Sequence, residues 1–414
     1  MDEAKQKFRL TSLERAWILY DVGNSAFVLL VATLIPIFFN ALAEGGGLSS
    51  VEYLAYWGYA ASAVTVITAV LSPILGTLAD TRNFKKPIFT FCVAVGVIGC
   101  CAMGMASTWL PFLLIFIFAK VGFSGSLVFY DSMLSDVTVP DRMDEVSSKG
   151  YAWGYIGSCV PFVVCLALVL GAGSIGISQM TALNLALLIT AAWWLVTTLP
   201  LLRQYKQVHF VEVQEHAIRQ SFARIGHTLR HLKEDRQVFW FLLAFFCYID
   251  GVYTIIDMAT AYGTALGLDT TGLLLALLVT QIVAFPSALV FGRLSGQYPS
   301  GTLIPVCIAA YAGIALFAFF LKHQWQFWVL AVVVGMFQGG IQALSRSHFA
   351  KIIPPEKSGE YFGLFDICGK GASFLGTMIV SVGSQLTGSA NVGVGSLIVL
   401  FVVGFVLFRV SDQK

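Results

Sequence analysis

Long apolar segments follow one another along almost the whole chain. Twelve such runs can be placed by the polar breaks between them, and a run of about 20 residues is what a helix needs to cross the hydrocarbon core of a bilayer. Their approximate ranges are 14–42, 53–79, 87–106, 109–135, 149–171, 178–202, 238–266, 271–292, 302–321, 325–345, 361–386 and 390–409. Strands of a membrane barrel would instead alternate apolar and polar residues over segments of about ten. The run length therefore predicts an all-α integral membrane protein with twelve transmembrane helices.

Composition agrees with a membrane environment and argues against several other classes of protein. Hydrophobic residues make up 57% of the 414 residues and charged residues only 12%, against about 25% charged in a typical soluble domain. The net charge is +2, with the basic residues spread along the chain, and the eight cysteines lie in apolar stretches without metal-ligand spacing. No Walker motif for ATP occurs. We therefore expect a lipid bilayer around the protein, and no nucleic acid, metal or cofactor.

Basic residues are distributed unevenly between the two sides of the predicted membrane. Of 25 Lys and Arg residues, 22 fall at the chain ends or in the even-numbered breaks between the runs. Positive charge is retained on the cytoplasmic side, so both termini are predicted to be cytoplasmic. A cleavable signal peptide, with 41–43 as its cleavage site, is the alternative for the first run. That run is too long for one and carries Asp21 and Asn24.

The two halves of the chain resemble each other. The hydrophilic break 203–236 divides the runs six and six, and segments of the first half align with segments of the second at offsets of 216 and 214. The aligned residues include Gly76 with Gly292, Gly125 with Gly339 and Pro140 with Pro354. A duplicated six-helix unit predicts two pseudo-symmetric bundles, 1–202 and 237–414, joined by the linker 203–236. In such an arrangement the substrate site lies at mid-membrane between the bundles.

Polar side chains interrupt the first predicted helix. Asp21, Asn24 and Ser25 fall at i, i+3 and i+4, so they share one helix face. A carboxylate in hydrocarbon is costly and is expected to face protein or water and to have a function. We expect this face to bind substrate in a central cavity, with Asp21 also a candidate for proton coupling.

Three further acids lie within predicted helices. Asp250 and Asp257 are seven residues apart in the seventh run and therefore share a face, and Asp131 lies near the inner end of the fourth. We predict proton coupling for all three. Asp250 is the central assignment, because its helix is the second-half counterpart of the helix that carries Asp21. The alternatives are a packing or helix-contact role for Asp250, a lock on the gate for Asp131, and contact with water toward the outside for Asp257.

Other candidates complete the predicted site. Gln338 and Gln342 form a polar stripe in the tenth run that continues to Arg346. Substrate binding is predicted for the two amides and gating for Arg346, with helix–helix hydrogen bonding as the alternative. Asp366 and Lys370 have the i, i+4 spacing of an ion pair. They are expected to act at the gate, with a structural pair close to the cytoplasmic end as the alternative. The aromatic residues expected to contact substrate are Tyr20, Tyr130, Trp153 and Tyr248.

The segment "GTLADTRNFKK", residues 76–86, resembles the loop motif of the major facilitator superfamily, in which Gly is followed by Asp and then by Arg or Lys. The resemblance implies the major facilitator fold and a gating role for Gly76, Asp80 and Arg82. Gly76 permits close approach of two helices, and Asp80 can cap a helix or pair with a cation. A plain basic loop would explain Arg82 but not Gly76 together with Asp80.

Four longer stretches resemble a narrower family. They are "YDVGNSAF" (20–27), "SSKGYAWGYIG" (147–157), "YIDGVYTI" (248–255) and "QGGIQALSRSHFAKIIPPEKSGEYFGLFD" (338–366). They are similar to the vacuole effluxer family, autophagy-related amino-acid exporters with many bacterial relatives. The chain has Val22 and Gly23 where that family usually has Trp and Ala, and Asp131 where Asn is common. The resemblance implies a bacterial inner membrane and amino acids as the leading substrates.

These features together predict a secondary active transporter and not an enzyme. We expect it to move a small polar or zwitterionic solute by alternating access, coupled to protons, as a monomer. Export of a larger amphipathic compound or drug is the alternative within transport. A membrane-embedded enzyme or a non-transporting sensor is the alternative from another class, but the chain shows no nucleophile–base pair or metal cluster and no added soluble domain.

Overall fold

The computed structural model describes residues 9–212, 230, 232, 235–265 and 267–412. The described residues of the first half form α1 (Ser12–Ala32), α2 (Leu34–Gly45), α3 (Ser50–Ala79), α4 (Lys85–Met103), α5 (Trp109–Ser132), α6 (Leu134–Val137), α7 (Pro140–Leu170) and α8 (Gln179–Gln204). Those of the second half form α10 (Arg236–Ala265), α11 (Thr270–Leu294), α12 (Ser300–Phe319), α13 (Gln324–Ile352), the 3-10 turn η1 (Pro355–Lys357), α14 (Ser358–Thr387), α15 (Ala390–Gly395) and α16 (Ile398–Ser411).

Each expected apolar run coincides with a helix or a helix pair. Within the described part of the chain, eleven helical segments are long and apolar enough to cross a membrane. The remaining expected run, 361–386, falls in α14, which is 30 residues long. The first run is divided into α1 and α2 at Thr33, because Pro36 has no N–H for the carbonyl of Ala32. The prediction of an all-helical membrane fold is confirmed.

Capping residues fix where several helices begin. At α1, Thr11 Oγ1 accepts the N–H of Glu14 and the Glu14 carboxylate accepts the N–H of Thr11, which satisfies two N–H groups that a helix start leaves open. Ser49 and Glu52 repeat this capping box at α3. α7 begins at Pro140, nine residues before the expected 149, since Pro is favoured at a first helical position. α7 therefore begins before its apolar run. α13 likewise extends past its run, to Ile352.

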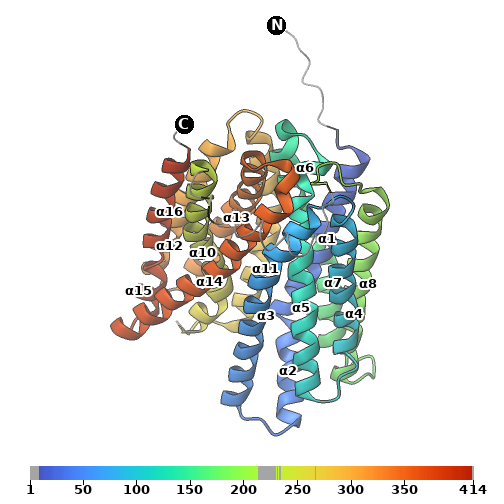
Figure 1. Ribbon diagram of the computed structural model, residues 1–414. Coiled ribbons are helices and arrows are strands. Elements are labelled where there is room, and N and C mark those ends of the chain that lie inside the picture. The colour runs from blue at the N-terminus through green and yellow to red at the C-terminus, as the bar shows by residue number, and fades with distance from the viewer. Residues whose placement is uncertain (1–8, 213–229, 231, 233–234, 266, 413–414) are drawn as a thin grey trace.

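The helices form two groups that lie side by side (Figure 1). We call α1–α8 the first bundle and α10–α16 the second bundle; they are drawn in blue to green and in yellow to red. Two helix pairs make extensive contacts between the bundles: α3 packs against α14, and α11 packs against α7. The described chain begins near Ser12 and ends near Ser411 at the same face of the molecule, which we call the terminal face (Figure 1).

Candidate functional site

A central cavity of ≈ 380 Å³ lies between the two bundles. It is lined by α1, α5 and α7 of the first bundle and by α10, α11, α13 and α14 of the second. The sequence-predicted site residues that line it are Asp21, Asn24, Ser25, Asp131, Asp257, Gln338, Gln342, Arg346 and Asp366. The cavity thus collects four acidic side chains and one basic side chain from the described residues, contributed by both bundles.

Arg346 connects the bundles at the terminal end of this cavity. Its Nη1 lies 3.0 Å from Asp131 Oδ1 and 3.6 Å from Asp21 Oδ2. Its Nε and Nη2 donate to the hydroxyl and the carbonyl of Ser147, at 2.9 and 3.0 Å. The side chain is only 2% exposed, and a buried charge needs such partners because it has lost its hydration. One cation of the second bundle is therefore held by three residues of the first.

Aromatic rings surround the same guanidinium. Its Cζ lies 4.6 Å from the ring centre of Trp17, 5.4 Å from that of Tyr130 and 4.3 Å from that of Tyr151, within the range of cation–π attraction. Tyr130 also donates its hydroxyl to Asp21 Oδ2 at 3.1 Å. Tyr130 thus holds the Asp21 carboxylate from the side away from the cavity. The sequence predicted that Tyr130 contacts substrate, but it is not among the residues that line the cavity.

Three glycines of α7 allow α1 to come close enough for this arrangement. A Cβ at Gly150 would lie 3.0 Å from Asp21 Oδ2, and one at Gly154 would lie 2.9 Å from the hydroxyl of Ser25. Gly157 continues the same face against α1. Sequence reasoning missed the contribution of these glycines and of Tyr151. The i, i+4, i+7 spacing of the glycines within "GYAWGYIG" was the available signal, because it places all three on one helix face.

Other polar side chains of the cavity also join the bundles. Tyr155 donates its hydroxyl to Gln342 Oε1 at 2.6 Å, and Ser72 donates to Asp366 Oδ2 at 2.7 Å. Gln338 is 4% exposed, and its Oε1 has no hydrogen-bond partner among the described residues. A buried amide oxygen is normally hydrogen-bonded, so Gln338 is the wall residue with unused bonding capacity. The side chain of Lys370 lies outside the described residues.

Like Tyr130, the other three aromatic residues predicted to contact substrate do not line the cavity. Tyr20 and Tyr248 are fully buried, and their hydroxyls meet Ser126 and Ser345 of their own bundles, each at 2.7 Å. Trp153 is 46% exposed and lies on another side of α7. These assignments from sequence are therefore corrected: the two tyrosines hold helices of one bundle together, because a buried hydroxyl needs a nearby partner.

Asp250 also lies behind the cavity wall and not in it. The carboxylate is fully buried, and its Oδ1 accepts the N–H of Gly376 in α14 at 2.9 Å. Asp250 is two residues beyond the buried Tyr248, whereas Asp21 is one residue beyond the buried Tyr20. At 100° per residue the two acids therefore point in different directions from their tyrosines. Two turns further along α10, Asp257 does line the cavity.

A second contact between the bundles lies at the terminal face, where α3 meets the start of α14; we call Gly76, Asp80 and Gly359 the Asp80 seam. Asp80 Oδ1 and Oδ2 accept the N–H groups of Gly359 and Glu360 at 2.7 and 2.9 Å. Open N–H groups at a helix start bind an anion well. Gly76 lies directly against the backbone of Gly359. The predicted gating residues Gly76 and Asp80 thus sit between the bundles.

Lys85 links the Asp80 seam to the rest of the first bundle. Its fully buried Nζ donates to Ser358 Oγ at 2.8 Å and lies 3.8 Å from Asp80 and 3.6 Å from Asp136. Burial raises the pKa of Asp80 to about 7, although Lys85 and the two backbone N–H groups act in the opposite direction. Arg82, the third predicted gating residue, points away and pairs with Glu212 at an exposed position.

The start of the linker packs onto this seam. Asp136 accepts the backbone N–H of His209 at 2.8 Å and lies 3.0 Å from its Nδ1. Burial acts to raise the pKa of Asp136, but hydrogen bonds from His209 and Tyr205 and the charge of Lys85 lower it overall. The same bond to Asp136 raises the pKa of His209 above its ordinary value. The linker is therefore fixed to the first bundle through a buried carboxylate.

Another contact between the bundles is formed by α11 and α7; we call Gly292 and Ser148 the Gly292 seam. A Cβ at Gly292 would lie 2.8 Å from the Cβ of Ser148. Beside it, Lys351 of α13 donates to Asp144 Oδ2 at 2.6 Å, and the lysine side chain is 27% exposed. Both named seams thus lie on the terminal side of the molecule, as do Arg346 and its partners Asp21, Asp131 and Ser147.

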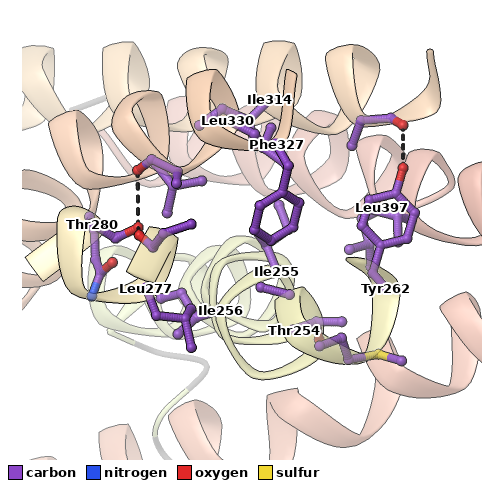
Figure 2. Close-up of a pocket in the computed structure, with 18 of the residues that line it drawn as sticks. Thr254, Ile255, Ile256, Tyr262, Leu277, Thr280, Ile314, Phe327, Leu330 and Leu397 are labelled. Carbon is purple, nitrogen blue, oxygen red and sulfur yellow. Dashed lines mark hydrogen bonds between the residues drawn. The ribbon is translucent and has the colours of Figure 1, made fainter. Parts of the chain in front are cut away.

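A smaller, apolar pocket of ≈ 60 Å³ lies within the second bundle, beside the central cavity. Phe327 and Leu330 of α13 face Ile255 of α10 across it (Figure 2). Two hydroxyls of its wall are satisfied by the bundle itself: Tyr262 donates to the carbonyl of Ala318 at 2.6 Å, and Thr280 donates to that of Ala331 at 3.1 Å (Figure 2). The pocket therefore offers mainly hydrocarbon to a ligand.

Comparison with solved structures identifies the class. The human organic anion transporter MFSD10 (TETRAN) matches with a TM-score of 0.72 at 14% identity, covering 96% of this chain and 98% of that chain. The transporter FucP in the outward conformation also matches with a TM-score of 0.72, at 17% identity and with coverage of 97% and 98%. At these identities the likeness concerns the fold alone. Two helix bundles with a cavity between them therefore have the fold of the major facilitator superfamily transporters.

The family is narrower. The model of the vacuole effluxer Atg22-like family matches residues 12–141 and 135–414, so the chain belongs to that family. The MFS-type transporter YxiO of Bacillus subtilis (strain 168) is 42% identical over 411 residues, which is 98% of this chain and 96% of that protein. Autophagy-related protein 22 of Saccharomyces cerevisiae (strain ATCC 204508 / S288c) is 25% identical over 315 residues, 66% of this chain and 59% of its own length. The resemblance inferred from the sequence motifs is confirmed.

Proposed function

We propose that the protein is a proton-coupled secondary transporter for a small zwitterionic solute, with amino acids as the leading class. The observation that carries this proposal is the acid-rich central cavity, in which Arg346 of one bundle is paired with Asp21 and Asp131 of the other. A site with both charges suits a zwitterion, and intramembrane carboxylates often mark proton pathways. Membership of the vacuole effluxer family supports transport of a small solute.

We propose the following roles in this cycle. Asn24, Ser25 and Gln342 contact the solute together with Asp21 and Gln338, and Asp131 and Asp257 exchange protons with it or with water. Arg346 and Asp366 tie the two bundles together when the terminal side is closed. Substrate binding would weaken the Arg346 pairs, because an anionic group of the solute competes for the same guanidinium.

We propose that the two bundles, 1–202 and 237–414, rock as rigid bodies about the cavity, with 203–236 as their linker. The distribution of Lys and Arg supports a cytoplasmic terminal face, in a bacterial inner membrane. The inter-bundle contacts of Asp80 and Arg346 then close the cytoplasmic side, which corresponds to the outward-facing state. We propose that one chain is sufficient for transport, since both of the bundles that rock about the cavity belong to the same chain.

The test is transport by the purified protein in proteoliposomes. An imposed pH gradient should drive accumulation of at least one labelled amino acid, and Asp131→Asn should abolish accumulation while exchange persists. Asp250→Asn is the matched control, since it removes a buried carboxylate outside the cavity wall and should leave accumulation intact. Loss of coupling in Asp250→Asn alone would instead assign proton coupling to Asp250, which is the central prediction from the sequence.

Export of an amphipathic compound is the second candidate, and the apolar pocket beside the central cavity is the feature that favours it. The same vesicles distinguish the two. Proton release driven by lipophilic cations, with no response to any amino acid, would replace the first proposal with the second.

A further inference from the structure

The apolar pocket and the central cavity adjoin. Ile256, Gln281 and Gln338 line both of them, so these three side chains form the boundary between the cavity and the pocket. The central cavity holds the charged groups, whereas the pocket is enclosed by aliphatic and aromatic side chains of α10, α11, α12 and α13 (Figure 2). Two chemically different compartments therefore share one wall.

Gln338 marks the boundary between them. The side chain is 4% exposed, and its Oε1 has no hydrogen-bond partner among the described residues. Leaving a buried amide oxygen without a donor costs free energy. A ligand that carries a donor group at this point would satisfy it. The position lies two turns of α13 from Arg346, about 12 Å along the helix axis.

The dimensions of the pocket limit what it can accept. At ≈ 60 Å³ it has room for roughly four to six water-sized groups. A methyl group contributes little there, while a chain of four or five carbons fills the space. The hydroxyls of Tyr262 and Thr280 are already bonded to backbone carbonyls, so a polar group placed in the pocket would lack partners among them.

We propose that the apolar pocket sets substrate specificity by receiving a hydrophobic side group of the transported zwitterion, whose ammonium donates to Gln338. This inference rests on the proposed function and deepens it. The polar end stays in the central cavity, and the hydrophobic group is removed from water in the second bundle. Because hydrophobic gain grows with the area buried, selection among zwitterions follows side-group length and not charge.

The probe is a homologous series of straight-chain L-amino acids, from glycine and alanine through norvaline and norleucine to 2-aminooctanoate. Binding to the purified full-length protein is followed by thermal-shift titration, since a ligand of the native state raises its apparent stability by mass action. Affinity should increase about three- to fourfold for each added methylene until the pocket is full, near norleucine, and then stop increasing.

Two variants in the pocket wall give opposite expectations. Ala331→Leu reduces the space and should move the best ligand to a shorter chain, whereas Phe327→Ala enlarges it and should move the best ligand to a longer one. Ala309→Leu, on an exposed side of α12, is the matched control and should leave the optimum at the wild-type length. A shift in opposite directions cannot arise from general loss of folding.

The outcomes separate the inference from the proposed function. If amino acids bind but the optimum is the same in wild type, Ala331→Leu and Phe327→Ala, the pocket does not set specificity, and the transport proposal stands. If no member of the series binds or moves protons, the amino-acid proposal fails and this inference fails with it. Equal affinity for glycine and norleucine in the wild type would also overturn the inference.

Discussion

The two seams occupy equivalent places in the duplicated fold but use different chemistry. Gly76 of α3 meets Gly359 of α14, and its counterpart Gly292 of α11 meets Ser148 of α7. At the Asp80 seam, a buried carboxylate accepts two N–H groups of the other bundle. The residue 216 positions further on, at the Gly292 seam, is Gly296, which has no side chain to accept them.

The difference shows how a symmetric fold can stabilise one conformation at the Asp80 seam while the Gly292 seam mainly supports movement of the bundles. Close backbone packing occurs at both seams, so both can support movement of one bundle against the other. Charge recognition is concentrated at one of them, where breaking the contact exposes Asp80, Lys85 and two helix N–H groups to a new environment. Beside the second seam, Asp144 pairs with Lys351, whose side chain is 27% exposed. Contact with water weakens such a pair relative to a fully buried one. We infer that the Asp80 seam sets the conformational equilibrium.

The largest effect is expected from glycine replacement. Gly76→Ala would push a Cβ into the backbone of Gly359, while Gly292→Ala meets the side chain of Ser148, which can move. Overpacking of this kind costs about 1–3 kcal/mol. Transport by Gly76→Ala should fall about tenfold or more, with a smaller loss in Gly292→Ala, measured as initial uptake per molecule of reconstituted protein. Equal losses in the two variants would remove the distinction between the seams.

Removal of charge should have the next largest effect. Asp80→Asn replaces one acceptor oxygen by an NH₂ group that faces a backbone N–H, so the seam loses a bond and gains a repulsion, worth about 1–3 kcal/mol. The matched change Asp144→Asn touches only the partly exposed pair with Lys351. Double electron–electron resonance between spin labels on the two bundles should show about tenfold less of the closed terminal side in Asp80→Asn. A shift of the same size in Asp144→Asn would contradict the assignment of the conformational equilibrium to the Asp80 seam.

The Asp80 seam should respond to pH. Its carboxyl has a pKa of about 7 when the seam is closed, above the ordinary value near 3.9 that it regains when hydrated. The closed seam thus binds more protons, so its contribution to stability is fully present below the ordinary value and is lost as pH rises through about 7. The same spin-label distances should show less of the closed form at pH 8 than at pH 5.5. Asp80→Asn should flatten this dependence; an unchanged profile would assign it to another group.

The smallest effect is expected at the linker. His209 pairs with Asp136 at a position that is 34% exposed, so His209→Gln should change the seam equilibrium by about twofold. The pKa of His209 is raised, so its contribution is present below about 6.5 and lost as pH rises through the raised value. Limited proteolysis of the segment 205–212 at pH 5.5 and pH 8 measures how strongly His209 holds this segment against the first bundle. Protection that is identical in wild type and variant at both pH values would show that the imidazole is not needed.

The sequence by itself determined the membrane fold, the duplication and several residues of the site. Run length and charge bias depend only on the chain and the bilayer, and the helices follow the expected runs. The i, i+3, i+4 spacing of Asp21, Asn24 and Ser25 placed them on one face, and all three line the cavity. The seam residues Gly76 and Asp80 were recognisable because their motif combines a close approach with a charge.

Only the tertiary structure decided which neighbour covers each helix face. Asp250 and Asp257 share a face of α10, yet α14 covers the first through Gly376 and leaves the second in the cavity. Likewise, Tyr20 and Tyr248 pack inward on Ser126 and Ser345. Helical periodicity fixes the angle between side chains on one helix, but the tilt and rotation of a membrane helix are set by its packing against neighbours. Burial of a polar group in the membrane is therefore decided by residues far away in the sequence.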